Sequence, residues 1–157
     1  MSFLHLFRWF SHTWLSCTMR DSTWGFAIVE VGHLLALAIL GGTILTLDLR
    51  LLGLGLKRQP AASVAQAVYP LLLGSLTLMV VSGVLLVATD PMKYYESGPF
   101  RIKILLLVIG IVVHFVIQIK TAKNKTEVIP VWTRGAAILS LLLWLGVGVA
   151  GRAIGLV

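Results

Sequence analysis

Four long stretches of this chain are almost free of charged side chains, and they restrict its fold more than any other feature. They are 25–47, 69–89, the segment between Lys103 and Lys120, and the segment between Arg134 and Arg152. A helix needs about 20 apolar residues to cross the ~30 Å hydrocarbon core of a bilayer. The shorter stretches approach that length because lysine and arginine at helix ends can extend to the interface. The sequence therefore predicts an all-α integral membrane protein with a four-helix bundle.

Composition supports one membrane domain without a separate soluble one. Of the 157 residues, 58% are hydrophobic and 12% are charged, whereas about a quarter of the residues of a soluble domain are charged. Residues 1–22 mix aromatic, aliphatic and basic side chains, which favours an amphipathic helix in the membrane interface, anchored by Trp9 and Trp14. Residues 23–157 are predicted to form the bundle.

The formal charge of +7 reflects basic residues at the ends of the predicted spans, so we expect membrane lipids as partners and no nucleic acid. The single cysteine, Cys17, excludes an internal disulfide. Basic residues are slightly more numerous in the first and third loops than on the opposite side, which by the positive-inside rule predicts periplasmic termini in a bacterial inner membrane. The two sets are Arg50, Lys57, Arg58, Lys120, Lys123, Lys125 and Arg134 against Arg8, Arg20, Lys93, Arg101, Lys103 and Arg152.

Three ionisable side chains fall well inside the predicted spans: Glu30, His33 and His114. Such residues are costly in hydrocarbon and usually functional. Counted from Trp24 and from Ile104, the two histidines are expected at a similar depth, ~14 Å below the same interface, at 1.5 Å per residue. Two imidazoles at one depth on two helices can clamp a haem iron. We therefore predict His33 and His114 as metal ligands of one haem b.

The neighbouring residues suit a haem. Gly110 lies one turn from His114, where it would let a flat macrocycle approach the backbone. Lys103 and Arg152 lie at the end of the spans nearer the histidines and could bind the two propionates, although each could equally be a plain interfacial anchor. Glu30, one turn from His33, could hydrogen-bond a ligand, relay a proton or bond to a neighbouring helix as the protonated acid.

Several short motifs resemble a known family. They are Glu30-Val31-Gly32-His33, the hexapeptide from Asp48 to Gly53 (DLRLLG), Phe100-Arg101-Ile102-Lys103 ahead of His114, and Gly151-Arg152. With these motifs the chain resembles small four-helix bacterial membrane proteins related to copper-resistance D proteins and to four-helix b-type cytochromes. The resemblance covers roughly residues 24 to 155 and implies a haem-carrying or copper-linked redox bundle. Carried over by position, it marks as site residues Glu30, His33, Arg50, Lys103, His114 and Arg152. Arg101, in the third motif, is a further candidate cofactor-binding residue. The dihaem cytochromes of that wider group use four histidines within the bundle, whereas this chain has two.

The favoured hypothesis is a b-type cytochrome that passes single electrons to or from a quinol, superoxide or a periplasmic redox protein. Whether it is also an oxidoreductase and whether it forms a homo-oligomer stay open. Copper transport or resistance is an alternative, although the four methionines, the soft ligands that Cu(I) prefers, are scattered. A structural subunit of a larger membrane complex is a third, for which the glycine-rich fourth span would provide packing.

Overall fold

The structure is a computed structural model that describes residues 3–123 and 131–156. All its regular elements in these ranges are helices. They are α1 (Phe3–Ser11), α2 (Trp14–Asp21), α3 (Thr23–Leu52), α4 (Ala61–Thr89), α5 (Pro91–Glu96), α6 (Gly98–Lys123) and α7 (Val131–Ile154). Helices α3, α4, α6 and α7 are long and apolar enough to cross a membrane. The predicted all-α membrane fold with four spanning helices is confirmed.

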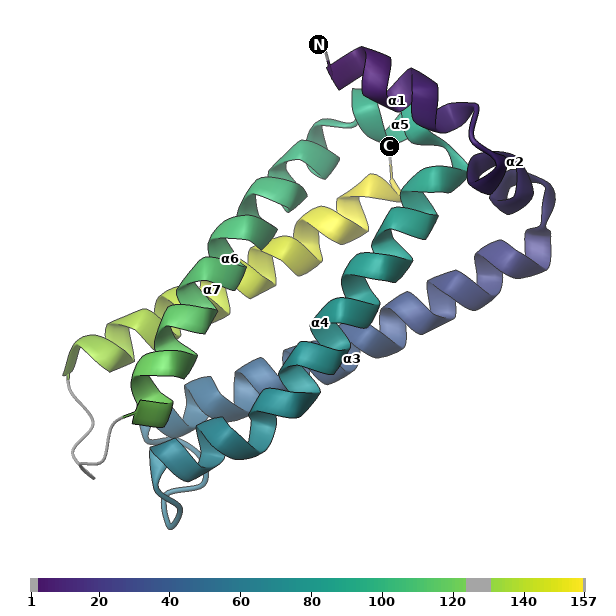
Figure 1. Ribbon diagram of the computed structural model, residues 1–157. Coiled ribbons are helices and arrows are strands. Elements are labelled where there is room, and N and C mark those ends of the chain that lie inside the picture. Colours follow the sequence, from purple (N-terminus) through teal and green to yellow (C-terminus); the bar gives the residue numbers. More distant parts are fainter. Residues whose placement is uncertain (1–2, 124–130, 157) are drawn as a thin grey trace.

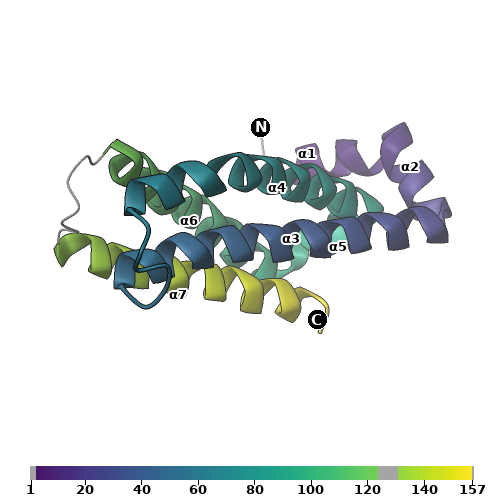
Figure 2. The same ribbon diagram turned by 90° about the horizontal axis from the view of Figure 1, so that it is seen from below.

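The spanning helices form two antiparallel hairpins that pack side by side (Figure 1). Helix α3 packs along α4, α6 packs along α7, and the hairpins meet through α3 against α7 and α4 against α6. Both chain termini and the short helices α1, α2 and α5 lie at one end, which we call the terminal end (Figures 1 and 2). The opposite end, where α3 connects to α4, is the loop end. The basic segment predicted between the third and fourth spans falls largely on 124–130, outside the described residues.

The borders of α3 follow from its capping residues. The hydroxyl of Ser22 accepts a hydrogen bond from the backbone N–H of Gly25, which caps the first turn. The helix runs past Asp48 and ends at Gly53, whose φ of 76° is the left-handed conformation that glycine adopts without strain. Asp48 is therefore inside the helix, whereas its place at the edge of an apolar run had predicted it at the helix end.

Helix α4 begins at Ala61, after Pro60, and not near Tyr69 and Pro70. The charge-free stretch 69–89 had predicted a start near Tyr69, but the helix extends further toward its N-terminus and Pro70 lies inside it. A membrane helix tolerates an internal proline when local adjustments satisfy the backbone carbonyl that the missing N–H frees.

The N-terminal segment forms two helices where one amphipathic helix was predicted. Thr13 caps α2 and separates it from α1. The buried Ser16 donates a hydrogen bond of 2.7 Å to the carbonyl of Ala88, and Arg20 donates one to the carbonyl of Thr89. These bonds tie α2 to the last turn of α4, whose carbonyls have no partner within the helix. Trp9 and Trp14 are exposed, as interfacial anchors would be.

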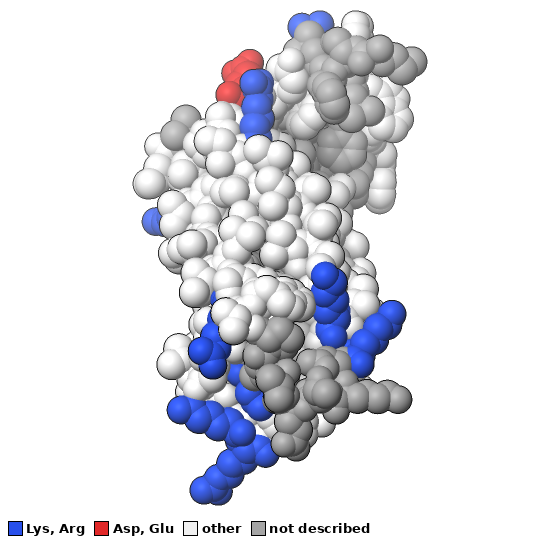
Figure 3. All heavy atoms as spheres, turned by 90° about the vertical axis from the view of Figure 1, so that its left-hand side faces the viewer, with Lys and Arg blue, Asp and Glu red and all other residues white. Residues whose placement is uncertain are grey.

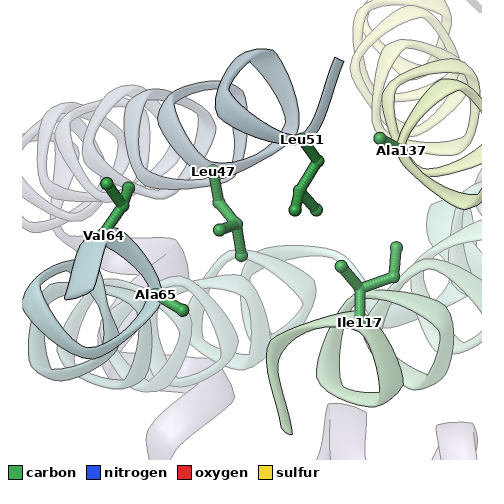
Figure 4. Packing of buried hydrophobic residues seen from close by; sticks show 6 residues of the cluster. All are labelled: Leu47, Leu51, Val64, Ala65, Ile117 and Ala137. Atoms are coloured by element: carbon green, nitrogen blue, oxygen red, sulfur yellow. The ribbon is translucent and has the colours of Figure 1, made fainter. Parts of the chain in front are cut away.

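Close packing of all four spanning helices is concentrated toward the loop end. Side chains from α3, α4, α6 and α7 point toward one another there (Figure 4), and this cluster comprises Leu47, Leu51, Val64, Ala65, Ile117 and Ala137. A second cluster, nearer the terminal end, has its buried members on α3 and α4 alone: Ala36, Leu40, Ile44, Leu72 and Met79. Many large apolar side chains on the outer faces are exposed, as expected of surfaces that contact lipid.

Candidate functional site

Four fully buried polar side chains meet between three of the spanning helices. Asp48 on α3 and Ser140 on α7 are 0% exposed, and His114 and Gln118 on α6 are each 1% exposed. We call these four residues the polar centre. A helix brings residues four apart to the same face, so His114 and Gln118 both point into the bundle. Polar groups at such a depth in a membrane bundle are rare and are usually functional.

The polar centre is joined by hydrogen-bonding contacts across helices. The Nδ1 atom of His114 lies 3.3 Å from the hydroxyl of Ser140, which also interacts with the carboxyl group of Asp48. A serine hydroxyl can donate one hydrogen bond and accept others. The imidazole of His114 on α6, the hydroxyl of Ser140 on α7 and the carboxyl group of Asp48 on α3 therefore lie next to one another, with the hydrogen bond to Asp48 not formed. One turn further along α6, Gln118 donates a hydrogen bond to the backbone carbonyl of Ala65 on α4.

The polar centre is also where buried polar atoms lack partners. Among the described residues, neither carboxyl oxygen of Asp48 has a partner that meets hydrogen-bond geometry, and the same holds for His114 Nε2 and Gln118 Oε1. The indole N–H of Trp144, one turn from Ser140 on α7, is likewise unpartnered. A carboxylate without a partner in an apolar interior is strongly disfavoured. The site therefore needs a proton, a cation or water to complete it.

His33 lies nearer the terminal end, in a separate polar cluster. Its Nδ1 is 2.8 Å from the hydroxyl of Ser82 on α4, and Ser82 donates its own proton to the carbonyl of Leu78. The hydrogen-bond network therefore assigns the ring proton to Nδ1, which leaves Nε2 as an acceptor in the neutral imidazole. The His33 ring packs against Gly83 of α4, where a Cβ would lie in ordinary contact at 3.4 Å from the ring.

Lys103 and Glu30 accompany His33, but in different ways. The Lys103 ammonium acts electrostatically on His33 and lies against Gly151 of α7. Glu30 is exposed, and its carboxylate acts on Tyr94 in the short helix α5. Burial raises the pKa of the Tyr94 phenol, and the negative charges of Asp90 and Glu30 raise it further. Glu30 thus faces the terminal end.

The structure does not bring His33 and His114 together. His33 is level with Ser82 on α4, whereas Gln118, one turn beyond His114, is level with Ala65 on the same helix. At 1.5 Å per residue, this register separates the two imidazoles by roughly 20 Å along the bundle. Two axial nitrogens of one iron stand only about 4 Å apart, given metal–imidazole bonds of about 2 Å. The prediction of a shared depth was therefore wrong.

The cause of this error is the choice of reference point on α6. The depth of His114 was counted from the residue after Lys103, as if the third span began there. In the structure α6 begins at Gly98, and Lys103 points into the bundle beside His33. His114 therefore lies deeper than His33 by about the whole length of helix from Lys103 to His114.

The other residues predicted to contact the haem have surroundings that differ from those expected of haem contacts. Gly110 is buried, but a Cβ there would meet the ring of Trp144 at 3.6 Å, so no macrocycle approaches the backbone at this position. Arg101 donates to the carbonyl of Tyr95 and lies over its ring. Arg152 is exposed at the terminal end, and Arg50 donates to the carbonyl of Gln59 in the first loop. These residues do not fit a haem held between His33 and His114.

Sequence reasoning missed Asp48, Gln118 and Ser140. In the sequence Asp48 resembles the first charged residue after a span, although Gly53 gives the true end of the helix. Gln118 lies four residues after His114 and so shares its helix face, which was the available signal. Ser140 carries no comparable signal, because serines are common in membrane helices that pack closely.

The fold and site define a multi-pass membrane protein whose four-helix bundle encloses a polar centre. A sequence profile described as a family of unknown function (DUF6644) matches residues 6–157. The chain therefore belongs to this family. No curated protein and no solved structure matches the chain.

Replacing Ser140 tests the linkage within the polar centre. Ser140→Ala removes the partner of His114 Nδ1 and should lower the free energy of unfolding by about 1–3 kcal/mol, the usual consequence of leaving a buried polar group unpaired. Ser75→Ala is the matched control because the Ser75 hydroxyl, also buried, bonds only to carbonyls of its own helix. Unfolding of both variants in detergent is the measurement, and equal losses would contradict the linkage.

Proposed function

We propose that this protein takes up and releases a proton within the membrane at the polar centre, as a relay in a transport or redox process. The observation that carries the proposal is the contiguous set His114, Ser140 and Asp48, buried between three helices with acceptor atoms left unpartnered. Chains of acidic and histidine side chains within membrane helices are typical of proton relays. The serine between them has the donor and acceptor capacity that a proton path requires.

The polar residues continue from the polar centre toward the loop end. Below His114 on the same face of α6 lie Gln118 and then Thr121, and on α7 lies Thr133, all of them buried. Apolar clusters lie on both sides of the polar centre, the first toward the loop end and the second toward the terminal end. On the terminal side the buried hydroxyls of Thr43, Ser75 and Ser82 bond to carbonyls of their own helices. We therefore propose that a proton reaches the polar centre from the loop end, along Gln118, Thr121 and Thr133.

Proton movement in reconstituted vesicles tests this proposal. Under an imposed membrane potential, vesicles with the wild-type protein should acidify faster than empty vesicles. Asp48→Asn should lower that rate at least about tenfold, because an amide cannot carry the proton. His114→Gln should act in the same direction. Asp90→Asn is the control, because Asp90 is an exposed carboxylate that caps α5. Wild-type vesicles that behave like empty ones, or an unaffected Asp48→Asn, would contradict the relay.

The orientation proposed with this function places the loop end in the cytoplasm of a bacterial inner membrane. Lys and Arg side chains gather at the loop end (Figure 3), and the positive-inside rule associates such a surface with the cytoplasm. Both termini would then be periplasmic, and protons would enter the polar path from the cytoplasm. A reporter enzyme that is active only in the periplasm should be active when it is fused to the C-terminus. An inactive fusion of normal abundance would indicate the opposite orientation.

A haem-linked electron carrier is the second candidate, and one observation favours it. Both imidazoles are held through Nδ1 by a serine of a neighbouring helix, so that Nε2 is the ring nitrogen left to bind a metal. Metal-ligating histidines are commonly fixed in this way. A haem, if bound, would supply single-electron chemistry, with a quinol or a periplasmic redox protein as partner. Copper handling stays a prediction. Among the described residues no three His, Cys, Asp or Glu side chains are grouped so that they could hold a metal ion.

A reduced-minus-oxidised optical spectrum of the purified protein tests the second candidate. A haem protein should show sharp bands on reduction. Because the two histidines are far apart along the bundle, the change in the bands caused by His33→Ala should differ from the change caused by His114→Ala. Colourless protein that takes up no added haem would reject this candidate. Identical loss in both variants would instead show that they share one iron and that the register of the hairpins is different.

A further inference from the structure

We propose that Lys103 is the anchor of an oxyanion-binding site, for a phosphate or carboxylate group, inside the terminal end of the bundle. This inference does not depend on proton transfer at the polar centre, from which it is separated by the second cluster. It starts from the position of one ammonium group and from the lack of an acidic partner for it.

Lys103 points into the bundle. A lysine near a helix end normally extends its ammonium toward water, and the neighbouring Arg101 and Arg152 are indeed exposed. Lys103, in contrast, is partly buried: its Nζ, Cε and Cδ atoms all lie along α7 at Gly151, with Nζ 3.5 Å from the position of a Cβ there. Its charge also reaches His33 on α3. The ammonium therefore lies among three helices.

No carboxylate of the described residues pairs with Lys103. Its ammonium forms neither an ion pair nor a hydrogen bond with any side chain or carbonyl in 3–123 and 131–156. Two other cations of the terminal end donate to backbone carbonyls: Arg20 to that of Thr89 and Arg101 to that of Tyr95. A cation partly withdrawn from water without a partner is costly, so an anion from outside the chain would stabilise this arrangement.

The surroundings of Lys103 select the chemistry of the ligand. Arg152 follows Gly151 on α7 and is exposed, and its guanidinium lies near Gly155, so Lys103 is the cation that points into the bundle here. Glu30 is exposed and forms no ion pair with Lys103 or Arg152 in the part of the chain that the structure describes. His33 offers Nε2 as an acceptor, which suits the acidic hydroxyl of a hydrogen phosphate. Lysine is a common phosphate ligand and acts there as a point charge.

The same phosphate chemistry has two sources at this level of the membrane. One is a free anion that enters from the aqueous side, and the other is the headgroup of an anionic phospholipid. Basic pockets between membrane helices bind such headgroups. A phospholipid phosphate bears no acidic hydroxyl, so His33 should matter for the free anion and much less for the lipid.

The test is thermal stability of the full chain in neutral detergent, titrated with inorganic phosphate or with acetate against chloride at equal ionic strength. Wild-type protein should be stabilised in a saturable way. Lys103→Met should lower the apparent affinity at least about tenfold, because it removes a charge-assisted contact and retains much of the length of the side chain. Lys93→Met is the matched control, as Lys93 is an exposed lysine of the same end. It should change the affinity by no more than about twofold.

A second arm uses nanodiscs of phosphatidylglycerol or phosphatidylcholine, with bound lipid detected by native mass spectrometry. Retained phosphatidylglycerol that depends on Lys103, without a response to inorganic phosphate, identifies the lipid headgroup as the source. A response to inorganic phosphate that weakens in His33→Gln identifies the free anion. Absence of both responses, or equal responses in wild type and Lys103→Met, overturns the proposal. Neither result bears on proton movement through Asp48.

Discussion

In the hydrocarbon of a membrane, each polar group of a protein must find its partner inside the protein. This constraint makes the four spans helical, and it also makes the few polar side chains between them conspicuous. Ser75 and Thr77 satisfy it by bonding to carbonyls of their own helix. Asp48 and His114 cannot do so, and they are held with Ser140 between three helices. The distinction separates ordinary membrane serines and threonines from a site whose chemistry is incomplete without a proton, cation or water.

The two histidines are held in the same way, but the serines that hold them have different second partners. In each case a serine on the neighbouring helix contacts Nδ1. Ser82 donates its hydrogen bond to the backbone carbonyl of Leu78 and so accepts from His33, which fixes the tautomer of that imidazole. Ser140 interacts with a carboxyl group, whose protonation can change. The first arrangement holds an imidazole in one state, whereas the second links two groups that can exchange a proton. This difference is why the polar centre, and not His33, carries the proposed relay.

The fold was largely predictable from the sequence, but the site was not. Runs of uncharged residues as long as 25–47 have one stable form in a bilayer, so the four spanning helices could be anticipated. Relative depth could not, since it depends on how each helix slides along its neighbours. Lys103 and Asp48 both resemble helix ends in the sequence, yet both side chains turn inward. A charge near the edge of an apolar run does not reveal which way it points.

Several contacts that hold this protein together run from a side chain to a backbone carbonyl. Ser16 bonds to Ala88, Arg20 to Thr89, Arg101 to Tyr95 and Gln118 to Ala65. For such a bond the chemical identity of the acceptor residue is irrelevant, while that of the donor is decisive. In diverging sequences the donors would be retained without any matching change at the acceptor positions. Methods that locate neighbours through paired substitutions would therefore be blind to the joints between α2 and α4 and between α4 and α6.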